Sequence, residues 1–280
     1  MELPIFHALS LMKLSIIITS YRSPELLKVC IEAIKKELSI SDYEIIVADG
    51  KTEETTTLMM QEDYPEINFL PFPKNDGFGF LVRNALAKAQ GDHILILNGD
   101  VIVKKDSIEK LLSYIQSHPE VGIVGPKLLN FNETFQPSCF KFYSPITILY
   151  RRTYLGKMWF AKKHLDNFIM KDFNHKSEQE VDWLMGSALM TSRQATEEVG
   201  PMDERFKMYF EDTDWCRRFW ENNYKVVYFP DSEMYHYHGK GSDSKSVWKS
   251  LFSNQLTWIH IISAIKFFIK YAGKDSPRKK

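Results

Sequence analysis

Residues 75–100 read NDGFGFLVRNALAKAQGDHILILNGD. Gly77 and Gly79 form a turn that opens a predicted helix, and the apolar strand 93–97 follows it and ends near the carboxylate of Asp100. The N-terminus of a helix offers free backbone N–H groups to a phosphate, and a carboxylate at a strand end suits Mg²⁺ or Mn²⁺. The stretch therefore predicts an α/β sheet that holds a phosphorylated ligand beside a metal ion.

Strands and helices alternate on both sides of this stretch. Apolar runs at 14–19, 44–49 and 67–72 precede it, and helical patterns cover 24–38 and 77–90. Such alternation predicts a mostly parallel sheet with helices on both faces. The elements expected after it are helices at 106–117, directly after 192 and up to 222, and strands at 121–124, 181–190 and 225–229.

Two regions depart from this pattern. Residues 131–176 are aromatic, basic and without a clean period, and we interpret them as a long excursion rather than a separate domain. Near the C-terminus, Trp258, Ile262 and Ile265 would share one face of an amphipathic helix that is too short to span a membrane. With the basic tail, that helix suits an anionic membrane surface, or alternatively docks on its own domain or on a partner subunit.

Composition limits the function classes. The 280 residues are 44% apolar, which is enough for a sizeable core. The 36 basic and 36 acidic residues give no net charge, which argues against a nucleic-acid partner. The three cysteines are odd in number and widely spaced, so a disulfide framework or a cysteine zinc site is not expected. Residues 1–12 lack the pattern of a signal peptide, and a cytoplasmic location follows as an expectation.

Several carboxylates lie at predicted strand ends or helix starts, where they could bind a ligand or act in catalysis. Asp49 ends a buried-looking strand and could accept a hydrogen bond from a base or a ribose, although a simple turn residue is as common there. Glu211, Asp212 and Asp214 place three carboxylates just ahead of a helix. One of them could be a general base with a raised pKa, and ordinary helix capping is the alternative.

Two histidines follow the last predicted strand. A neutral imidazole of His236 or His238 could complete a metal site with Asp100 or contact a phosphate. Because alternate residues of an extended chain point to opposite sides, only one of the two can serve a given ion. We predict that His236 is the ligand.

The order of these motifs resembles the inverting glycosyltransferases of family 2, especially the rhamnosyltransferase-like branch, which also resembles galactofuranosyltransferases. The resemblance covers roughly residues 13–242. Its motifs are SIIITSY at 15–21, IVAD at 46–49, residues 75–84, LNGD at 97–100, VDWLMG at 181–186, MYFEDTD at 208–214 and residues 236–242.

The resemblance implies a GT-A fold, a Rossmann-like α/β fold, with a C-terminal amphipathic helical segment added. Residues 1–12 would be an N-terminal extension and 243–280 a helical, basic tail. The domain between them, 13–242, would consist of a nucleotide-sugar half, 13–125, and an acceptor half, 126–242.

The resemblance also implies roles for individual residues. Asp212 would be the catalytic base, and Asp100 and His236 would hold Mg²⁺ or Mn²⁺. The donor nucleotide and its diphosphate would contact Thr19, Tyr21, Asp49, Asn75, Gly77, Gly79, Arg83, Asn84, Asn98 and Asp100. The sugar and the acceptor would contact Trp183, Gly186, Glu211 and Asp214.

Two departures from the family pattern matter. Gly50-Lys51-Thr52 follows Asp49 where the family usually has asparagine or small polar residues, which weakens any assignment of the base. The metal motif Asn98-Gly99-Asp100 has one carboxylate where many relatives have two. Metal binding is therefore expected to depend on the phosphates of the nucleotide.

The expected function is hexosyl transfer in the synthesis of a cell-surface polysaccharide. The donor would be a dTDP- or UDP-sugar, rhamnose-like or galactofuranose-like, and the acceptor a glycan or a polyprenyl-diphosphate-linked glycan. The enzyme could sit peripherally on the inner face of the cell membrane and could form a homo-oligomer.

Two alternatives remain for the function. A nucleotidyltransferase that makes NDP-sugars would show a glycine- and arginine-rich loop near the first strand, which residues 19–24 do not resemble. A non-catalytic relative that binds nucleotide-sugars is disfavoured because both Asp100 and Asp212 are present.

Overall fold

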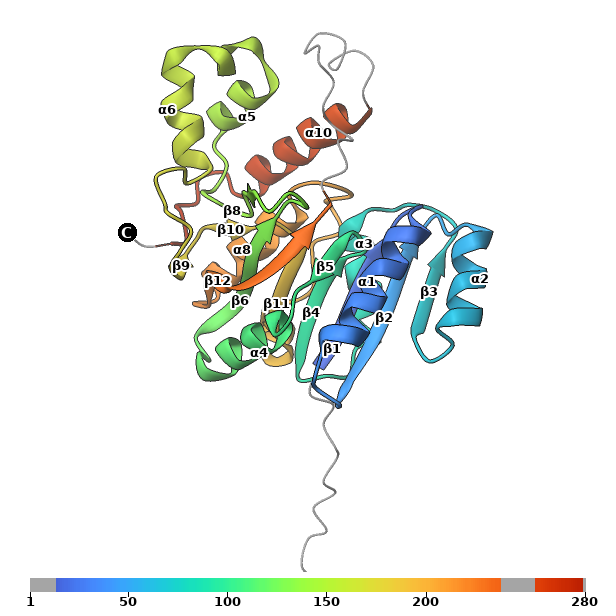
Figure 1. Ribbon diagram of the computed structural model, residues 1–280. Helices are drawn as coiled ribbons and strands as arrows, with labels where there is room; N and C mark the ends of the chain where they lie inside the picture. The colour runs from blue at the N-terminus through green and yellow to red at the C-terminus, as the bar shows by residue number, and fades with distance from the viewer. Residues whose placement is uncertain (1–13, 238–254, 279–280) are drawn as a thin grey trace, which may run out of the picture.

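The computed structural model describes residues 14–237 and 255–278. One large sheet forms the centre of the molecule (Figure 1). Its strands are β1 (Leu14–Ser20), β2 (Tyr43–Gly50), β3 (Asn68–Phe72), β4 (His93–Asn98), β5 (Val101–Val103), β6 (Val121–Leu129), β7 (Phe135–Gln136), β9 (Gln179–Glu180), β11 (Ala188–Ser192) and β12 (Lys225–His236). Their order is β3-β2-β1-β4-β11-β6-β12-β5, with β7 paired to β6 and β9 to β12.

The sheet is parallel where the sequence alternates strand and helix. β1 pairs in parallel with β2 and β4, and β2 with β3. β11 enters antiparallel between β4 and β6, while β12 returns parallel to β6. The predicted mixed α/β fold with a mostly parallel sheet is confirmed.

Helices cover both faces of this sheet. They are α1 (Pro24–Glu37), α2 (Glu54–Asp63), α3 (Phe78–Leu86), α4 (Ser107–Ser117), α7 (Arg193–Val199) and α8 (Glu211–Glu221). Ile16 and Ile18 of β1 pack in the cluster that includes α1 and α4, whereas Ile17 packs in the cluster that includes α3 and α8. Strands buried on both faces need apolar residues at every position, which explains the unbroken apolar runs.

The region 131–176 contains helices that the sequence pattern did not predict. They are α5 (Pro145–Arg152), the 3₁₀ turn η1 (Tyr154–Lys157) and α6 (Trp159–Phe168), and together they project from the sheet (Figure 1). Ser144 caps α5 in a reciprocal box with Thr147, and Pro145 occupies the first turn, where it fits best. These local signals start α5 although its apolar pattern is weak.

The strand predicted at 181–190 was wrong. The segment divides into β10 (Trp183–Leu184), which pairs with β8 (Cys139–Phe140) in a separate small sheet, and β11 in the large sheet. The chain turns between them at Gly186, whose N–H donates to the Asp212 carboxylate over 3.1 Å. A tertiary contact, not the local pattern, ends the first strand.

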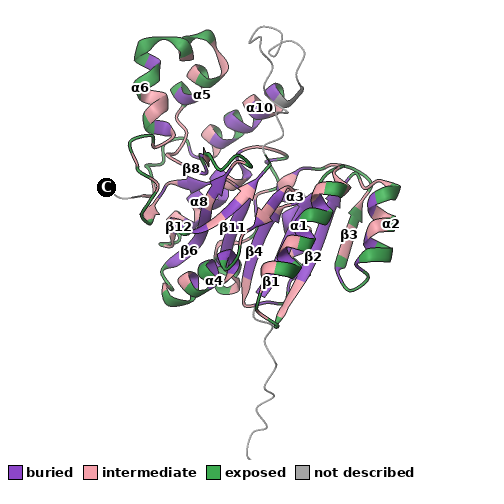
Figure 2. Ribbon diagram, viewed as in Figure 1, coloured by how far each residue is buried: buried purple, intermediate pink, exposed green. Residues whose placement is uncertain are grey.

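The C-terminal helix α10 (Gln255–Lys270) docks on the domain and still exposes an apolar stripe. Ala264, Phe267 and the following Tyr271 pack against Phe206 and Phe210. The opposite face exposes Trp258, Ile262, Ile265 and Ile269, and Figure 2 shows the burial along this helix. No helix among the described residues is both long and apolar enough to cross a bilayer.

Candidate active site

Two adjoining cavities open where β1 and β4 end. The smaller, about 290 Å³, is lined by Thr19, Ser20, Tyr21, Ser23, Asn75, Phe78, Leu81, Asn98, Gly99, Asp100 and Met208. The larger, about 460 Å³, shares Phe78, Asn98, Asp100 and Met208 with it, so the two are continuous. The larger one also reaches Trp183, Gly186, Glu211, Asp212 and His236. Most of the predicted site residues therefore lie around one continuous space.

Neighbouring strand ends set the floor of the smaller cavity. Thr19 Oγ1 donates to Asn98 Oδ1 over 3.2 Å, and the Gly99 N–H donates to the Thr19 carbonyl over 2.8 Å. These bonds hold the ends of β1 and β4 together and place Asp100 at the junction of the two cavities. Tyr21 lines the smaller cavity and remains 47% exposed, so its ring face is accessible to a planar ligand.

The two glycines of the opening motif serve contacts within the protein. Gly77 has φ of 98°, and a Cβ there would lie 1.4 Å from the Lys207 carbonyl oxygen. Gly79 lies beside α8, where a Cβ would be 3.5 Å from Glu211 Cβ. Only glycine permits the approach at 77, and this approach joins the turn before α3 to the segment that leads into α8.

Besides Gly77 and Gly79, three further predicted donor-binding residues do not line the two cavities. Arg83 donates to the Met202 carbonyl over 3.4 Å, and Asn84 Nδ2 donates to the Phe80 carbonyl over 2.8 Å. Asp49 is fully buried at the end of β2, and neither of its carboxylate oxygens accepts a hydrogen bond from the described residues. Burial raises the pKa of Asp49. An unsatisfied carboxylate at this place is ready for an N–H or O–H donor.

Asp100 and His236 meet because β5 pairs antiparallel with β12, with Val101 opposite His236. His236 Nε2 lies 3.3 Å from Asp100 Oδ1, and His236 Nδ1 lies 2.8 Å from Gln136 Oε1. A glutamine carbonyl only accepts, so in the neutral ring Nδ1 carries the proton. The Nε2 lone pair then faces the carboxylate, an arrangement that favours a cation.

The distances fit a divalent ion at this pair. Adjacent ligands of an octahedral ion, each at about 2.1 Å, lie about 3 Å apart. Asp100 Oδ1 is buried and accepts no hydrogen bond from the described residues. Within the described ranges, no His, Cys, Asp or Glu completes a group of three metal-ligating side chains. The described residues would thus supply two ligands and leave other positions to ligand oxygens. His238 lies outside the described residues.

The backbone is strained directly before Glu211 and Asp212, and this strained turn sets the direction of the two side chains. Tyr209 and Phe210 both have left-handed conformations, with φ of 66° and 70°. Each such non-glycine residue costs about 1–2 kcal/mol. The buried Phe210 ring packs against Tyr143 and Phe267, with ring centroids 4.6 and 5.2 Å away, and this packing holds the turn. Asp212 follows in the first turn of α8, facing the larger cavity.

Glu211 and Asp212 have different electrostatic surroundings. Asp212 Oδ1 accepts from the Thr213 N–H over 2.7 Å, and Oδ2 accepts from the Gly186 N–H over 3.1 Å. Glu211 Oε2 is buried and accepts no hydrogen bond from the described residues. Burial, together with the Asp212 charge, raises the pKa of Glu211 well above its usual range, and burial raises the pKa of Asp212. The two backbone N–H groups therefore favour the ionised form of Asp212 over that of Glu211.

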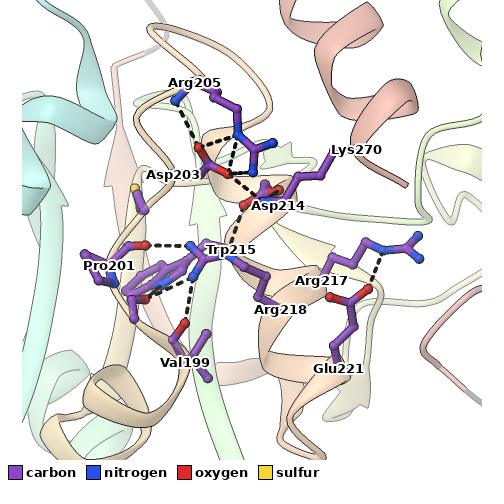
Figure 3. Close-up of polar contacts among 12 residues, drawn as sticks. Val199, Pro201, Asp203, Arg205, Asp214, Trp215, Arg217, Arg218, Glu221 and Lys270 are labelled. Atoms are coloured by element: carbon purple, nitrogen blue, oxygen red, sulfur yellow. Dashed lines mark hydrogen bonds and ion pairs between the residues drawn. The ribbon is translucent and has the colours of Figure 1, made fainter. Parts of the chain in front are cut away.

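Asp214 faces away from the cavity. It is fully buried, accepts from Arg218 Nε over 3.0 Å and from the Tyr271 hydroxyl over 2.8 Å, and pairs with Lys270. Lys270 also reaches Asp203 over 2.7 Å, and Figure 3 shows the side chains converging. Asp214 was predicted to contact the sugar. In the structure its carboxylate instead joins α8 to α10.

Apart from Trp183, the sequence pattern missed the wall opposite the strand ends. Trp183 stacks on Phe140 with ring centroids 4.5 Å apart, and its indole N–H donates to the Lys141 carbonyl over 2.8 Å. Tyr143, Arg151, Arg152 and His260 complete this wall from α5, α10 and the chain before α5. The only signal in the sequence was the basic and aromatic composition of 131–176.

Comparisons with known proteins agree with this arrangement. A model of "Glycosyl transferase family 2" matches residues 15–184. The N-acetylglucosaminyl-diphospho-decaprenol L-rhamnosyltransferase of Mycobacterium tuberculosis is 28% identical over 72% of this chain and 69% of its own length. The low-salt glycan biosynthesis hexosyltransferase Agl10 of Haloferax volcanii is 25% identical over 76% and 63%.

Solved structures share the fold at low identity. S. aureus TarS 1–349 has a TM-score of 0.55 at 15% identity, over 80% of this chain and 60% of that one. The mannosyltransferase PcManGT of Pyrobaculum calidifontis, solved with GDP-Man and Mn²⁺, has a TM-score of 0.57 at 14% identity, over 95% and 76%. They support the predicted GT-A fold. The family model matches more than half of the residues of this chain. The chain therefore belongs to glycosyltransferase family 2.

Proposed function

We propose that this glycosyltransferase moves a sugar, with inversion, from a dTDP- or UDP-sugar to a hydroxyl of a glycan or a lipid-linked glycan. The observation that carries the proposal is the Asp212 carboxylate. It is held by two backbone N–H groups in a cavity that continues to Asp100 and His236. A base and a cation-binding pair thus share one space.

The smaller cavity is proposed to bind the donor nucleotide. Thr19, Tyr21 and Asn75 line it, and Asp49 lies buried at the neighbouring strand end with an unsatisfied carboxylate. Two structures of similar fold were solved with Mn²⁺ together with UDP and GalNAc or with GDP-Man, which supports a divalent ion here. Asp100 and His236 would hold Mg²⁺ or Mn²⁺, which supplies charge neutralisation for a leaving diphosphate.

Asp212 is proposed as the general base. An ionised carboxylate with a raised pKa removes the proton of the acceptor hydroxyl as that oxygen attacks the anomeric carbon. Attack from the face opposite the leaving nucleotide inverts the configuration. Glu211, protonated beside it, adds no second negative charge and can donate a hydrogen bond to the sugar.

The acceptor is proposed to be a glycan carried on a polyprenyl diphosphate. The mycobacterial relative is named for rhamnose transfer to a lipid-linked acceptor of this type, in keeping with a rhamnose-like donor here. The exposed stripe Trp258, Ile262, Ile265 and Ile269 of α10 supports peripheral contact with the inner face of the cell membrane. Lys270, by contrast, points inward to Asp203 and Asp214 and is not available to lipid.

We also propose the division of the domain near residue 125, which falls within β6. Residues 13–125 would form the nucleotide-sugar half and 126–242 the acceptor half. The predicted N-terminal extension, 1–12, and the start of the predicted tail, 243–254, lie outside the described residues.

Donor turnover tests the proposal. The protein is incubated with a panel of UDP-, dTDP- and GDP-sugars, with and without Mn²⁺, and release of nucleoside diphosphate is followed. We expect release from a dTDP- or UDP-sugar that requires the metal. Failure to bind or turn over any donor would refute the proposal, and pyrophosphate release from a nucleoside triphosphate would indicate a nucleotidyltransferase instead.

A further inference from the structure

Two adjacent arginines reach the larger cavity from the last turn of α5. Arg151 and Arg152 both line this cavity together with Asp212, and neither lines the smaller one. Arg151 donates to the Tyr143 hydroxyl over 2.6 Å. Neither guanidinium lies within ion-pair distance of a carboxylate of the described residues. The cavity therefore has a cationic end without an acidic partner among residues 14–237 and 255–278.

Arg152 is the more unusual of the two. It is half-buried, and no hydrogen bond joins its side chain to any described residue. Burial, followed by the neighbouring charge of Arg151, lowers the pKa of Arg152. The C-terminus of a helix attracts cations, which accounts for arginines in the last turn. It does not account for a partly desolvated guanidinium to which the described part of the chain offers no counter-ion, since that costs free energy.

The helices α5, η1 and α6, which form a projection from the sheet, have an unusual surface. Beyond the two arginines this projection exposes Tyr154, Leu155, Met158, Trp159 and Phe160, with Trp159 84% exposed. Residues 134–165 contain six basic residues and no acidic one, within a chain of zero net charge. Exposed aromatic and apolar side chains in the same segment as lysines and arginines suit an apolar ligand with an anionic head.

We propose that Arg151 and Arg152 form a subsite for a phosphate or diphosphate group of the acceptor. Guanidinium groups bind phosphate oxygens in bidentate, charge-assisted pairs, which would satisfy both cations. Such a group at this end of the cavity leaves the attached sugar to extend toward Asp212. The inference rests on the proposed function, because it assigns the donor to the other end of the same space.

Direct binding to the full chain tests the subsite without any donor. Isothermal titration calorimetry is run in EDTA with farnesyl diphosphate, inorganic pyrophosphate and farnesol. We expect farnesyl diphosphate to bind, farnesol not to bind, and Arg152→Gln to weaken binding about tenfold. Arg152→Lys should restore part of the affinity. Lys163→Gln, which removes an exposed charge from the same projection, should leave it unchanged.

The comparison of ligands identifies the source of the phosphate. Tighter binding of farnesyl diphosphate than of pyrophosphate would indicate a lipid headgroup, and equal binding would indicate a soluble phosphate. Equal affinities of the wild type and Arg152→Gln would overturn the subsite. So would binding that appears only when Mn²⁺ replaces EDTA, because the phosphate would then occupy the metal end. Since no sugar is transferred in this measurement, its outcome is independent of the donor-turnover test.

Discussion

The two halves of this site are held together by different forces. In the half proposed to bind the donor, every residue of β1 is buried, and apolar clusters on both faces of the sheet position Thr19 and Asn98. In the half proposed to bind the acceptor, a strained turn, a buried charge network and aromatic stacking position Asp212 and α10. Regular packing forms the proposed donor site, whereas irregular contacts form the wall of the proposed acceptor site.

The largest expected effect is on catalysis. If the acceptor half contributes the base, Asp212→Asn should lower the rate of sugar transfer by about a thousandfold, because asparagine cannot take the hydroxyl proton. The measurement is nucleoside diphosphate release with acceptor present. Donor binding, followed by calorimetry, should stay within about twofold, since the donor contacts lie in the other half.

Asp212→Asn also needs a folding control, because Asp212 accepts two backbone hydrogen bonds. Circular dichroism and the melting temperature of the variant show whether α8 is intact. A correctly folded variant that keeps full activity would show that the base is a different group. It would also contradict the proposal that the acceptor half contributes the base.

The next effect concerns stability. Lys270→Met removes one partner of the buried Asp214 and of Asp203, and we expect the free energy of unfolding to fall by about 2–3 kcal/mol. Lys28→Met is the matched control in the donor half, since Lys28 pairs with Asp63 at the surface. It should leave the urea midpoint unchanged. Equal midpoints for the two variants would mean that the charge network does not hold the acceptor half.

The smallest effect is a pH dependence. The pKa of Glu211 is raised by burial, so the folded state binds this proton more tightly than the unfolded state does. Stability from this group is complete below pH 4.5, the unfolded pKa, and is lost as the pH rises toward the higher folded pKa.

Glu211→Gln removes this titration while keeping the shape of the side chain. It should therefore be more stable than the wild type at pH 8, with the difference shrinking below pH 4.5. Thermal unfolding across this range measures it. A variant less stable than the wild type at pH 8 would show that Glu211 is ionised in the fold.

The local pattern of apolar residues predicted strands and helices best where burial is regular. The runs that became β1, β2 and β4, and the turn at Gly77, could be recognised because each residue's environment follows from its neighbours along the chain. The interrupted strand at Gly186 could not, because a hydrogen bond to Asp212, 26 residues away, ends it. The arginines of α5 were missed for the same reason, since nothing near them in sequence reveals the cavity.

The sequence by itself determined the α/β fold, the order of the motifs and the candidacy of Asp100, His236 and Asp212. Hydrophobic periodicity and residue type are local properties, and both can be recognised in the sequence alone. Only the tertiary structure decided that Asp214 pairs with Lys270 and that Gly77 meets the Lys207 backbone. It also decided that Arg152 lines the cavity with no counter-ion from the described residues. These are contacts between distant segments, and their energies depend on distance and burial, which a sequence does not contain.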